Sequence, residues 1–399
     1  MIMTWFRGRV YLKPQTEGKI MQLIPAVWPN PAAHLRQHQP DQPVYYFMPT
    51  KLQETARSFM SGYPGLVTYA VKANDALEVL QNLVAAGIRA FDVASISEIR
   101  SVLAACPDAV LHYNNPVRSV DEIRQADALN VRSYSVDCLS ELEKVADVLP
   151  PFGVEISVRL KLPIEGAKYD FGSKFGAEPA MAQRLLKRVD ELGYKASMTF
   201  HPGTQCADPA AWVSYISVCA DIARRAGVRI HRLNTGGGYA AFRKGQAPEI
   251  TPIFTAIKRA VAKAFPDNAP QLICEPGRAM VADAFVLATR VKALREDDSI
   301  FLNDGIYGSF CESPSMGTVE RVVVLDAQGD PKNGQMRPRV VFGPTCDSLD
   351  CLPEAVQLPD DLAEGDYVLF HGMGAYASAT VTRFNGYGDI GQVTVKAAS

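Results

Sequence analysis

Three residues of types that do chemistry stand beside short hydrophobic runs in this chain. Lys72 ends the run VTYAVK, His201 opens HPGTQC, and Glu275 lies in CEPGRAM. Burial lowers the pKa of a lysine, which suits Lys72 to forming a Schiff base with an aldehyde. A carboxylate such as Glu275 can accept a hydrogen bond from a ring nitrogen and so help an aromatic ring to accept electrons. These residue types indicate catalysis through an electron-withdrawing cofactor.

The glycine triplet Gly236–Gly238 in LNTGGGYA is the fourth such feature. Backbone amides in a glycine-rich turn can approach an anion closely, and a phosphate is the natural ligand. The triplet lacks the dinucleotide and Walker patterns, so neither NAD nor ATP is favoured. Each feature also has a structural explanation: a solvated loop for Lys72, a packed ring for His201, a salt bridge from Glu275 to Arg278, or a simple turn at the glycines.

Alternating β-type runs and helical patterns between about residues 66 and 275 predict how these residues are positioned. Eight such units favour a (β/α)₈ barrel, whose active site lies at the carboxyl ends of its strands. The runs are Leu66–Val71, Ala90–Val93, Val110–Tyr113, Ser133–Val136, Glu155–Leu160, Ser197–Phe200, Ile230–Leu233 and Gln271–Cys274. The residues at their ends are polar, charged or glycine: Lys72, Asp92, Asn115, Asp137, Arg159, His201, Gly236–Gly238 and Glu275.

The pattern changes after residue 281 to short strand-like segments separated by Gly, Asp and Pro. We therefore expect an α/β chain with three parts: an N-terminal segment (1–44), a barrel (45–280) and a mostly β domain (281–399). The N-terminal segment is expected to contribute to the β domain. A barrel-only carrier protein is excluded by this C-terminal part.

The composition of the chain excludes several other classes of protein. The 399 residues carry a net charge of −2, which disfavours nucleic acid as a partner. No run approaches the roughly 18 apolar residues needed to span a membrane, and the first residues lack the apolar region of a secretory signal. The eight cysteines are scattered, which indicates reduced thiols and no zinc site. We expect a cytoplasmic protein without a metal.

Eight sequence blocks in order, from about residue 44 to 387, resemble the fold-type III pyridoxal-5′-phosphate (PLP) decarboxylases. This family includes ornithine, lysine and diaminopimelate decarboxylases, and the resemblance is closest to the ornithine and lysine enzymes. The blocks are YAVKAN (69–74), FDVASISE (91–98), HPGTQC (201–206), NTGGGY (234–239), CEPGR (274–278), NDGIYGSF (303–310), GPTCDSLD (343–350) and MGAY (373–376).

The resemblance implies a role for each matched residue. Lys72 would hold PLP as a Schiff base, His201 would stack on its ring, and Glu275 would bond the ring nitrogen. In the related alanine racemases an arginine takes this last place, so Glu275 favours a decarboxylase, a carbon–carbon lyase. Further residues implied around the cofactor are Asp92, Glu98, Arg159, Thr204, Gly237, Gly238, Gly277, Arg278 and Tyr376.

The same resemblance implies the substrate and the assembly. Cys346 would return a proton after CO₂ leaves, and Asp347 would bind the distal amine of the substrate, with Tyr307 and Glu312 beside it. In the family, Cys346 and Asp347 reach the active site from the other subunit, which implies a homodimer. The expected reaction converts a basic diamino L-amino acid, such as ornithine or lysine, into a diamine of polyamine biosynthesis.

One segment departs from the family pattern. Ornithine decarboxylases carry an aspartate for the distal amine shortly after the YGSF block, but here CESPSMGTV (311–319) has Met316 at about that position. One charge-assisted hydrogen bond contributes roughly 1.5–3 kcal/mol, so its loss affects selectivity. The alternatives are therefore a different or modified amino acid of specialised metabolism as substrate, or a non-catalytic PLP-binding relative.

Overall fold

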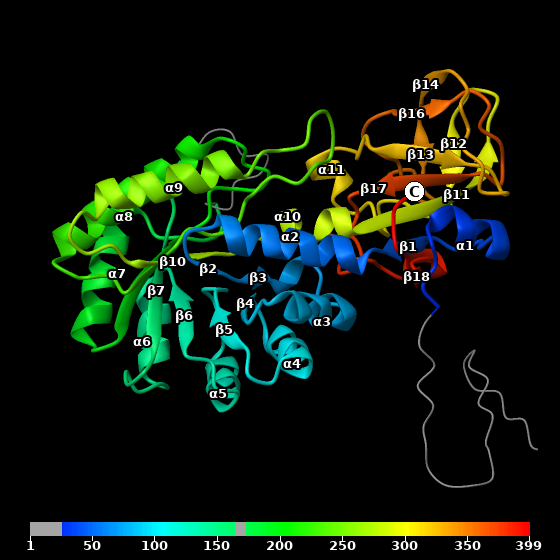
Figure 1. Ribbon diagram of the computed structural model, residues 1–399. Helices are drawn as coiled ribbons and strands as arrows, with labels where there is room; N and C mark the ends of the chain where they lie inside the picture. The colour runs from blue at the N-terminus through cyan, green and yellow to red at the C-terminus, as the bar shows by residue number, and fades with distance from the viewer. Residues whose placement is uncertain (1–25, 164–172) are drawn as a thin grey trace, which may run out of the picture.

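Nine short parallel strands form the wall of a barrel in the computed structural model, which describes residues 26–163 and 173–399 (Figure 1). Their order around the barrel is β2-β10-β9-β8-β7-β6-β5-β4-β3. The bounds are β2 (Leu66–Val67), β3 (Tyr69–Ala70), β4 (Ala90–Val93), β5 (Val110–Tyr113), β6 (Ser133–Val136), β7 (Glu155–Leu160), β8 (Lys195–Phe200), β9 (Arg232–Asn234) and β10 (Gln271–Cys274).

The first predicted run is divided into β2 and β3 at Thr68, and this break closes the barrel. Leu66 of β2 pairs with Ile273 of β10, whereas Tyr69 of β3 pairs with Phe91 of β4. Between them, the backbone N–H and the hydroxyl of Thr68 both donate to the carbonyl of Cys274, at 2.9 and 3.0 Å. The ring therefore has no free edge there. The barrel predicted from eight runs is confirmed.

Helices alternate with these strands and cover the outside of the barrel (Figure 1). Two of them begin at a residue whose side chain caps the helix. The hydroxyl of Ser95 accepts the N–H of Glu98, and the carboxylate of Asp208 accepts the N–H of Ala210. The bounds are α2 (Pro49–Gly62), α3 (Leu77–Ala86), α4 (Ile96–Ala105), α5 (Val120–Ala128), α6 (Leu139–Ala146), α7 (Pro179–Glu191), α8 (Pro209–Ala226), α9 (Thr251–Ala264) and α10 (Arg278–Val281).

A second, mostly β part is built from both ends of the described chain. Its main sheet has the order β13-β17-β11-β1-β18, and β12 pairs with β11 and β15. Because β1 lies between β11 and β18, an early segment joins the C-terminal strands, as expected. The bounds are α1 (Pro31–His38), β1 (Val44–Phe47), β11 (Phe285–Leu294), β12 (Ile300–Leu302), α11 (Ser313–Met316), β13 (Val322–Leu325), β14 (Met336–Arg339), β15 (Val341–Phe342), β16 (Val356–Pro359), β17 (Tyr367–His371) and β18 (Gly391–Thr394).

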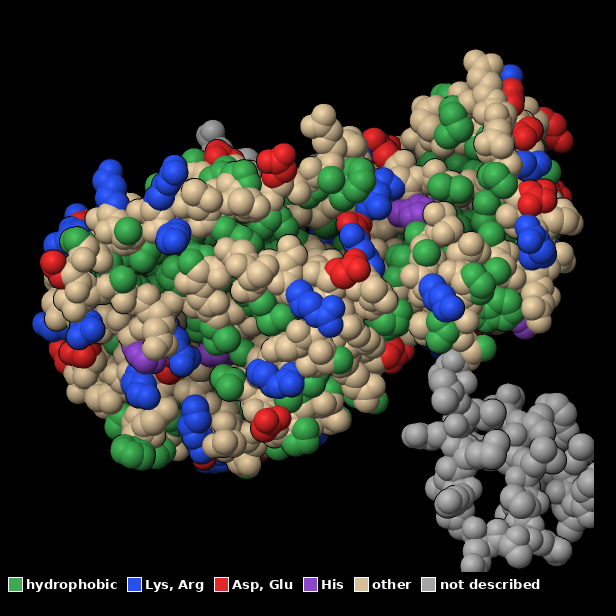
Figure 2. Space-filling model, viewed as in Figure 1, with side chains coloured by type: hydrophobic (Ala, Val, Ile, Leu, Met, Phe, Trp, Pro, Cys, Tyr) green, Lys and Arg blue, Asp and Glu red, His purple; other side chains and the backbone are tan. Residues whose placement is uncertain are grey.

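The boundaries expected at 44/45 and 280/281 stay predictions, and residues 1–25 of the N-terminal segment lie outside the described residues. Within the described ranges, no helix is long and apolar enough to cross a bilayer. On the face in Figure 2, positive and negative side chains alternate over both parts of the molecule, in keeping with the small net charge.

Burial of His112 on β5 makes stability depend on pH. Its Nδ1 lies 3.1 Å from the hydroxyl of Ser133, its Nε2 has no hydrogen-bond partner among the described residues, and burial lowers its pKa to about 4. Below the ordinary histidine pKa of about 6.5 the unfolded chain therefore binds the proton more readily than the folded chain. We expect the free energy of unfolding to fall by about 2 kcal/mol from this group between pH 7 and pH 5.

Urea unfolding of the wild type and of His112→Asn at the two pH values measures this contribution. Asparagine keeps a polar atom toward Ser133 but cannot titrate. An equal loss of stability in both proteins would show that His112 is not the responsible group.

Candidate active site

The carboxyl ends of the barrel strands open into a pocket of about 290 Å³. Its lining comes from strand ends and the loops after them, together with α10, α11 and the loop that follows β17. A pocket of this size suits a small organic ligand. The lining residues are Ala70, Lys72, Asp92, His201, Thr204, Gly238, Tyr239, Glu275, Gly277, Arg278, Glu312, Ser315, Met316 and Tyr376.

Lys72 projects into this pocket from a single 3₁₀ turn, η1 (Val71–Ala73), directly after β3. The turn is fixed by the N–H of Tyr376, which donates to the carbonyl of Ala73 at 2.7 Å. Burial by itself lowers the pKa of Lys72, but Tyr376 and Asp92 raise it, and the net direction is upward. The lowered pKa expected from burial is therefore wrong for this chain without a bound cofactor, because the acidic groups around Lys72 outweigh desolvation.

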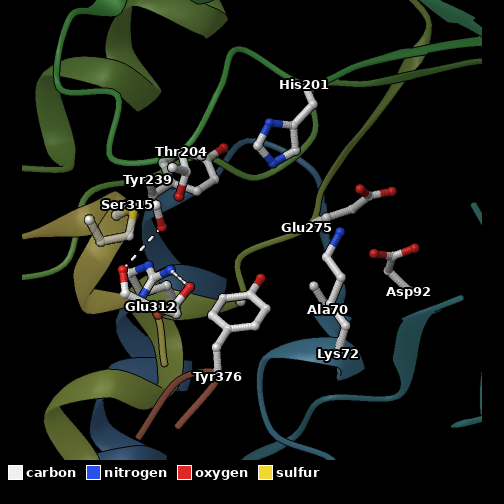
Figure 3. A pocket seen from close by; sticks show the side chains of 14 residues that line it. Ala70, Lys72, Asp92, His201, Thr204, Tyr239, Glu275, Glu312, Ser315 and Tyr376 are labelled. Carbon is white, nitrogen blue, oxygen red and sulfur yellow. Dashed lines mark hydrogen bonds and ion pairs between the residues drawn. The ribbon is translucent and has the colours of Figure 1, made fainter. Parts of the chain in front are cut away.

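Glu275 directly follows β10 and faces the same space as Lys72 (Figure 3). Its Oε1 accepts hydrogen bonds from Asn114 Nδ2, at 2.5 Å, and from Asn234 Nδ2. Burial raises the pKa of the carboxyl, and the bond from Asn234 opposes this shift. Because both amides bond the same oxygen, Oε2 is left toward other donors.

The two asparagines were not recognised as site residues from the sequence. Asn115 was placed at the end of its run, yet Asn114 is the residue that immediately follows β5 and reaches Glu275. The sequence feature that could have identified Asn114 is its position as the first polar residue after that run. Asn234 ends β9, one residue beyond the predicted run, so its position also marks the carboxyl edge of the barrel.

Two further charged side chains stand beside Lys72 and Glu275. Asp92 lies on β4, and burial followed by the charge of Glu275 raises its pKa well above the usual value. Arg159 lies inside β7, and its guanidinium is 5.1 Å from the ring centre of Phe175. Arg159 lines an adjoining pocket of about 240 Å³ that shares Lys72, Asp92, His201 and Glu275 with the first.

His201 follows β8 and is held as a neutral ring. Its Nδ1 accepts the N–H of Gly203 at 3.1 Å, which leaves the proton on Nε2. Burial lowers the pKa of His201 well below its usual range, and the charge of Lys72 lowers it further. A neutral, flat imidazole at the pocket wall can stack on an aromatic ligand.

The glycine triplet fits between two loops where no side chain has room. A Cβ at Gly237 would lie 2.6 Å from the carbonyl oxygen of Glu275, and one at Gly238 would lie 2.3 Å from that of Gly203. Gly238 also has a positive φ of 85°, which favours glycine. Its carbonyl accepts the N–H of Cys206 at 2.9 Å, which ties the triplet to the loop that carries Thr204.

Glu312 lies at the other end of the pocket from Lys72 and Asp92 (Figure 3), and it forms a two-point ion pair with Arg278. The two bonds measure 2.7 and 2.6 Å, and the guanidinium lies 4.8 Å from the ring centre of Tyr376. Glu312, which was expected to contact the substrate, is thus bonded to a residue expected to contact phosphate. Met316 also lines this pocket.

Three predicted residues are not brought to Lys72 within one chain. Cys346 is exposed, and its N–H donates to Asn385 Oδ1 at 3.0 Å. The hydroxyl of Tyr307 donates to Asp347, whose pKa is lowered first by the N–H of Leu349 and then by this bond. Among the residues described, none of these three lines the pocket of Lys72.

The donor set of the pocket fits PLP. An amine for the aldehyde, a carboxylate for the ring nitrogen and a neutral ring for stacking surround one cavity. The triplet, where a Cβ would clash, offers backbone amides for the phosphate, and Arg278 Nε is buried without a hydrogen-bond partner among the described residues. An unsatisfied buried donor favours an anionic ligand.

Comparisons with known proteins agree with this chemistry. The family model described as "Pyridoxal-dependent decarboxylase, pyridoxal binding domain" matches residues 49–282. Ornithine decarboxylase of Mus musculus is 34% identical over 345 residues, covering 80% of this chain and 73% of that protein. Lysine/ornithine decarboxylase of Selenomonas ruminantium is 33% identical over 334 residues, covering 80% and 81%. The solved arginine decarboxylase of Paramecium bursaria Chlorella virus, bound to agmatine, superposes with a TM-score of 0.81 at 26% identity and covers 90% of this chain and 98% of its own.

Proposed function

The chain belongs to the pyridoxal-dependent decarboxylase family, as its eight sequence blocks predict, and we propose that it decarboxylates a basic L-amino acid such as ornithine or lysine to a diamine. It is a PLP-dependent decarboxylase by family. The observation that carries the proposal is the presence of Lys72, Glu275 and His201 around one pocket at the carboxyl end of the barrel. Relatives named for ornithine, lysine and arginine support the substrate class.

PLP, when bound, withdraws electrons from Cα so that the carboxylate can leave as CO₂. Lys72 is the residue proposed to bind its aldehyde covalently, which requires the amine to give up its proton first. Glu275 is proposed to hold the proton at the ring nitrogen, and the amides of Asn114 and Asn234 orient this carboxylate. Arg278, Thr204 and the glycine triplet are proposed to hold the phosphate.

Cys346 and Asp347 are proposed to act across the interface of a homodimer. Cys346 would deliver from Sγ the proton that replaces the carboxylate at Cα, and Asp347 would bind the distal ammonium of the substrate. Two observations support an interface at this surface. Leu349 is 70% exposed two residues beyond Asp347, and the exposed ring of Phe384 lies 4.9 Å from that of Tyr307. Exposed apolar side chains beside functional residues favour a partner surface.

A second candidate substrate is a different amino acid, either modified at its distal amine or with a shorter side chain. Met316 lines the pocket where the family would have a carboxylate, and both oxygens of Glu312 are bonded to Arg278. Neither Met316 nor Glu312 therefore offers a free carboxylate to an ammonium. A modified or shorter diamino acid of specialised metabolism would lose less binding energy at this side of the pocket, because it does not place a free ammonium beside Met316.

CO₂ release by the purified holoenzyme from a panel of amino acids, with product identification, tests the proposal. We expect kcat/KM for L-ornithine or L-lysine to exceed that for neutral amino acids of similar length by at least about tenfold. This is the contribution of one charge-assisted hydrogen bond to the distal ammonium. Preference for N-modified or neutral substrates would replace the first candidate by the second. Absence of turnover with PLP fully bound would favour a non-catalytic relative.

A further inference from the structure

None of the roles proposed above for the active-site residues explains the ion pair between Arg278 and Glu312. Both terminal nitrogens of Arg278 donate to the two oxygens of Glu312, at 2.7 and 2.6 Å. The side chain of Arg278 is only 8% exposed and that of Glu312 is 25% exposed. The pair is therefore largely shielded from water, where removal of one partner leaves an uncompensated charge.

The guanidinium has one edge that Glu312 does not use. Arg278 Nε is buried and has no hydrogen-bond partner among the described residues, whereas its terminal nitrogens face the carboxylate. A guanidinium carries five N–H donors, but it has a single positive charge to share between two anions. An incoming phosphate would meet a cation that is already neutralised.

We propose that Glu312 is the resident counter-ion of Arg278 in the cofactor-free protein, and that it competes with the cofactor's phosphate for this guanidinium. Glu312 thereby stabilises the empty pocket and lowers the affinity for the phosphate group. The inference rests on the proposed position of the phosphate at Arg278. It assigns Glu312 a role toward the cofactor in place of the expected role toward the substrate amine.

The carboxylate is held for this role by its own segment. Glu312 directly precedes α11, and its carbonyl accepts the N–H groups of Ser315 and Met316. The far end of α11 is tied as well, because Arg243 Nη2 donates to the carbonyl of Gly317 at 2.7 Å. Glu312 is thus presented to Arg278 from a short element fixed at both ends.

Thermodynamic linkage predicts in which direction the Tm and the PLP affinity change when Glu312 is replaced. Glu312→Gln leaves Arg278 without an anion in the cofactor-free protein, whereas the bound phosphate can satisfy it in the holoenzyme. We expect the cofactor-free variant to have a lower Tm than the wild type and to bind PLP about tenfold more tightly. The dissociation constant is measured by absorbance titration without substrate, and inorganic phosphate is expected to raise the Tm of the variant more than that of the wild type.

Pyridoxal, which lacks the phosphate, provides the ligand control. The affinity for pyridoxal should be the same in the wild type and in Glu312→Gln. The ratio of PLP affinity to pyridoxal affinity should therefore rise in the variant. Glu354→Gln is the matched protein control, because the carboxylate of Glu354 accepts the N–H of Thr318 at 2.9 Å near the same segment. This variant should leave that ratio unchanged. Glu312→Asp, whose shorter side chain weakens the pair, should shift the ratio in the same direction if the glutamine variant does not fold without cofactor.

Two results would overturn the inference. Weaker PLP binding by Glu312→Gln would mean that Glu312 orients Arg278 for the phosphate, and equal changes for PLP and pyridoxal would mean a general effect on the pocket. Failure of the proposed phosphate position is seen separately, as an unchanged ratio of PLP to pyridoxal affinity in Arg278→Ala. The proposed function is tested by CO₂ release alone and does not enter these binding measurements.

Discussion

Replacement of Lys72 by alanine is expected to lower kcat/KM for CO₂ release by about 10⁴-fold, the upper end of what one positioned catalytic group contributes. The variant loses the amine that we propose to bind the cofactor covalently, although Glu275, His201 and the glycine triplet, which we propose to hold PLP, remain. The absorbance spectrum should therefore change from that of a covalently bound cofactor to that of a free aldehyde. Spectra and rates recorded on the same PLP-saturated samples measure both effects.

Lys174 provides a matched control for this experiment. It lines the adjoining pocket that Lys72 also lines, and its Nζ lies 5.0 Å from the ring centre of Phe175. Lys174→Ala removes a lysine near the site without removing the amine that we propose to react. Persistence of the covalent absorbance in Lys72→Ala, with its loss in Lys174→Ala, would assign the reacting amine to Lys174.

The barrel could be predicted because parallel strands buried on both faces are marked in the sequence by short continuous apolar runs. All eight runs became strands of the barrel wall. The division of the first run at Thr68 could not be predicted, since it depends on hydrogen bonds to Cys274 across the closed ring. Such closure is a property of residues about 200 positions apart, and no local pattern encodes it.

The polar residues of the site could be located by their positions at strand ends, but their interactions could not. The rule for barrels placed Lys72, His201 and Glu275 at one edge. It did not reveal that Asn114 and Asn234 bond Glu275, because these contacts join three different strands. The direction of the Lys72 pKa was also missed, since it depends on the balance between desolvation and neighbouring charges.

The same limit applies to Glu312. The resemblance implied that Glu312 lies beside Asp347 at the distal amine of the substrate. The pairing with Arg278 depends on where α11 lies over the pocket.

Equal mixing of Lys72→Ala with Cys346→Ala, two nearly inactive variants, is expected to restore about a quarter of the wild-type activity if subunits exchange and each site uses both chains. Half of the dimers are then mixed. In each mixed dimer, one site combines an intact Lys72 with an intact Cys346 from the partner, and the other site contains both substitutions. Cys346 is exposed and does not line the pocket of Lys72 in its own chain, so it can serve only a site on another chain.

A mixture of Cys346→Ala with Asp347→Ala is the matched control, because both substitutions lie on the same loop. Every site of such a mixed dimer receives a defective loop, so no activity should return. Both mixtures pair two inactive proteins of the same fold. If activity returns only in the first mixture, the cause is an active site shared between subunits, and nonspecific stabilisation is excluded. Absence of recovery in the first mixture, despite exchange shown by mass spectrometry of tagged chains, would mean that Cys346 does not serve the partner's Lys72. The proton donor would then have to be sought among residues that line the pocket of the same chain, where Tyr376 and Ser315 present hydroxyl groups.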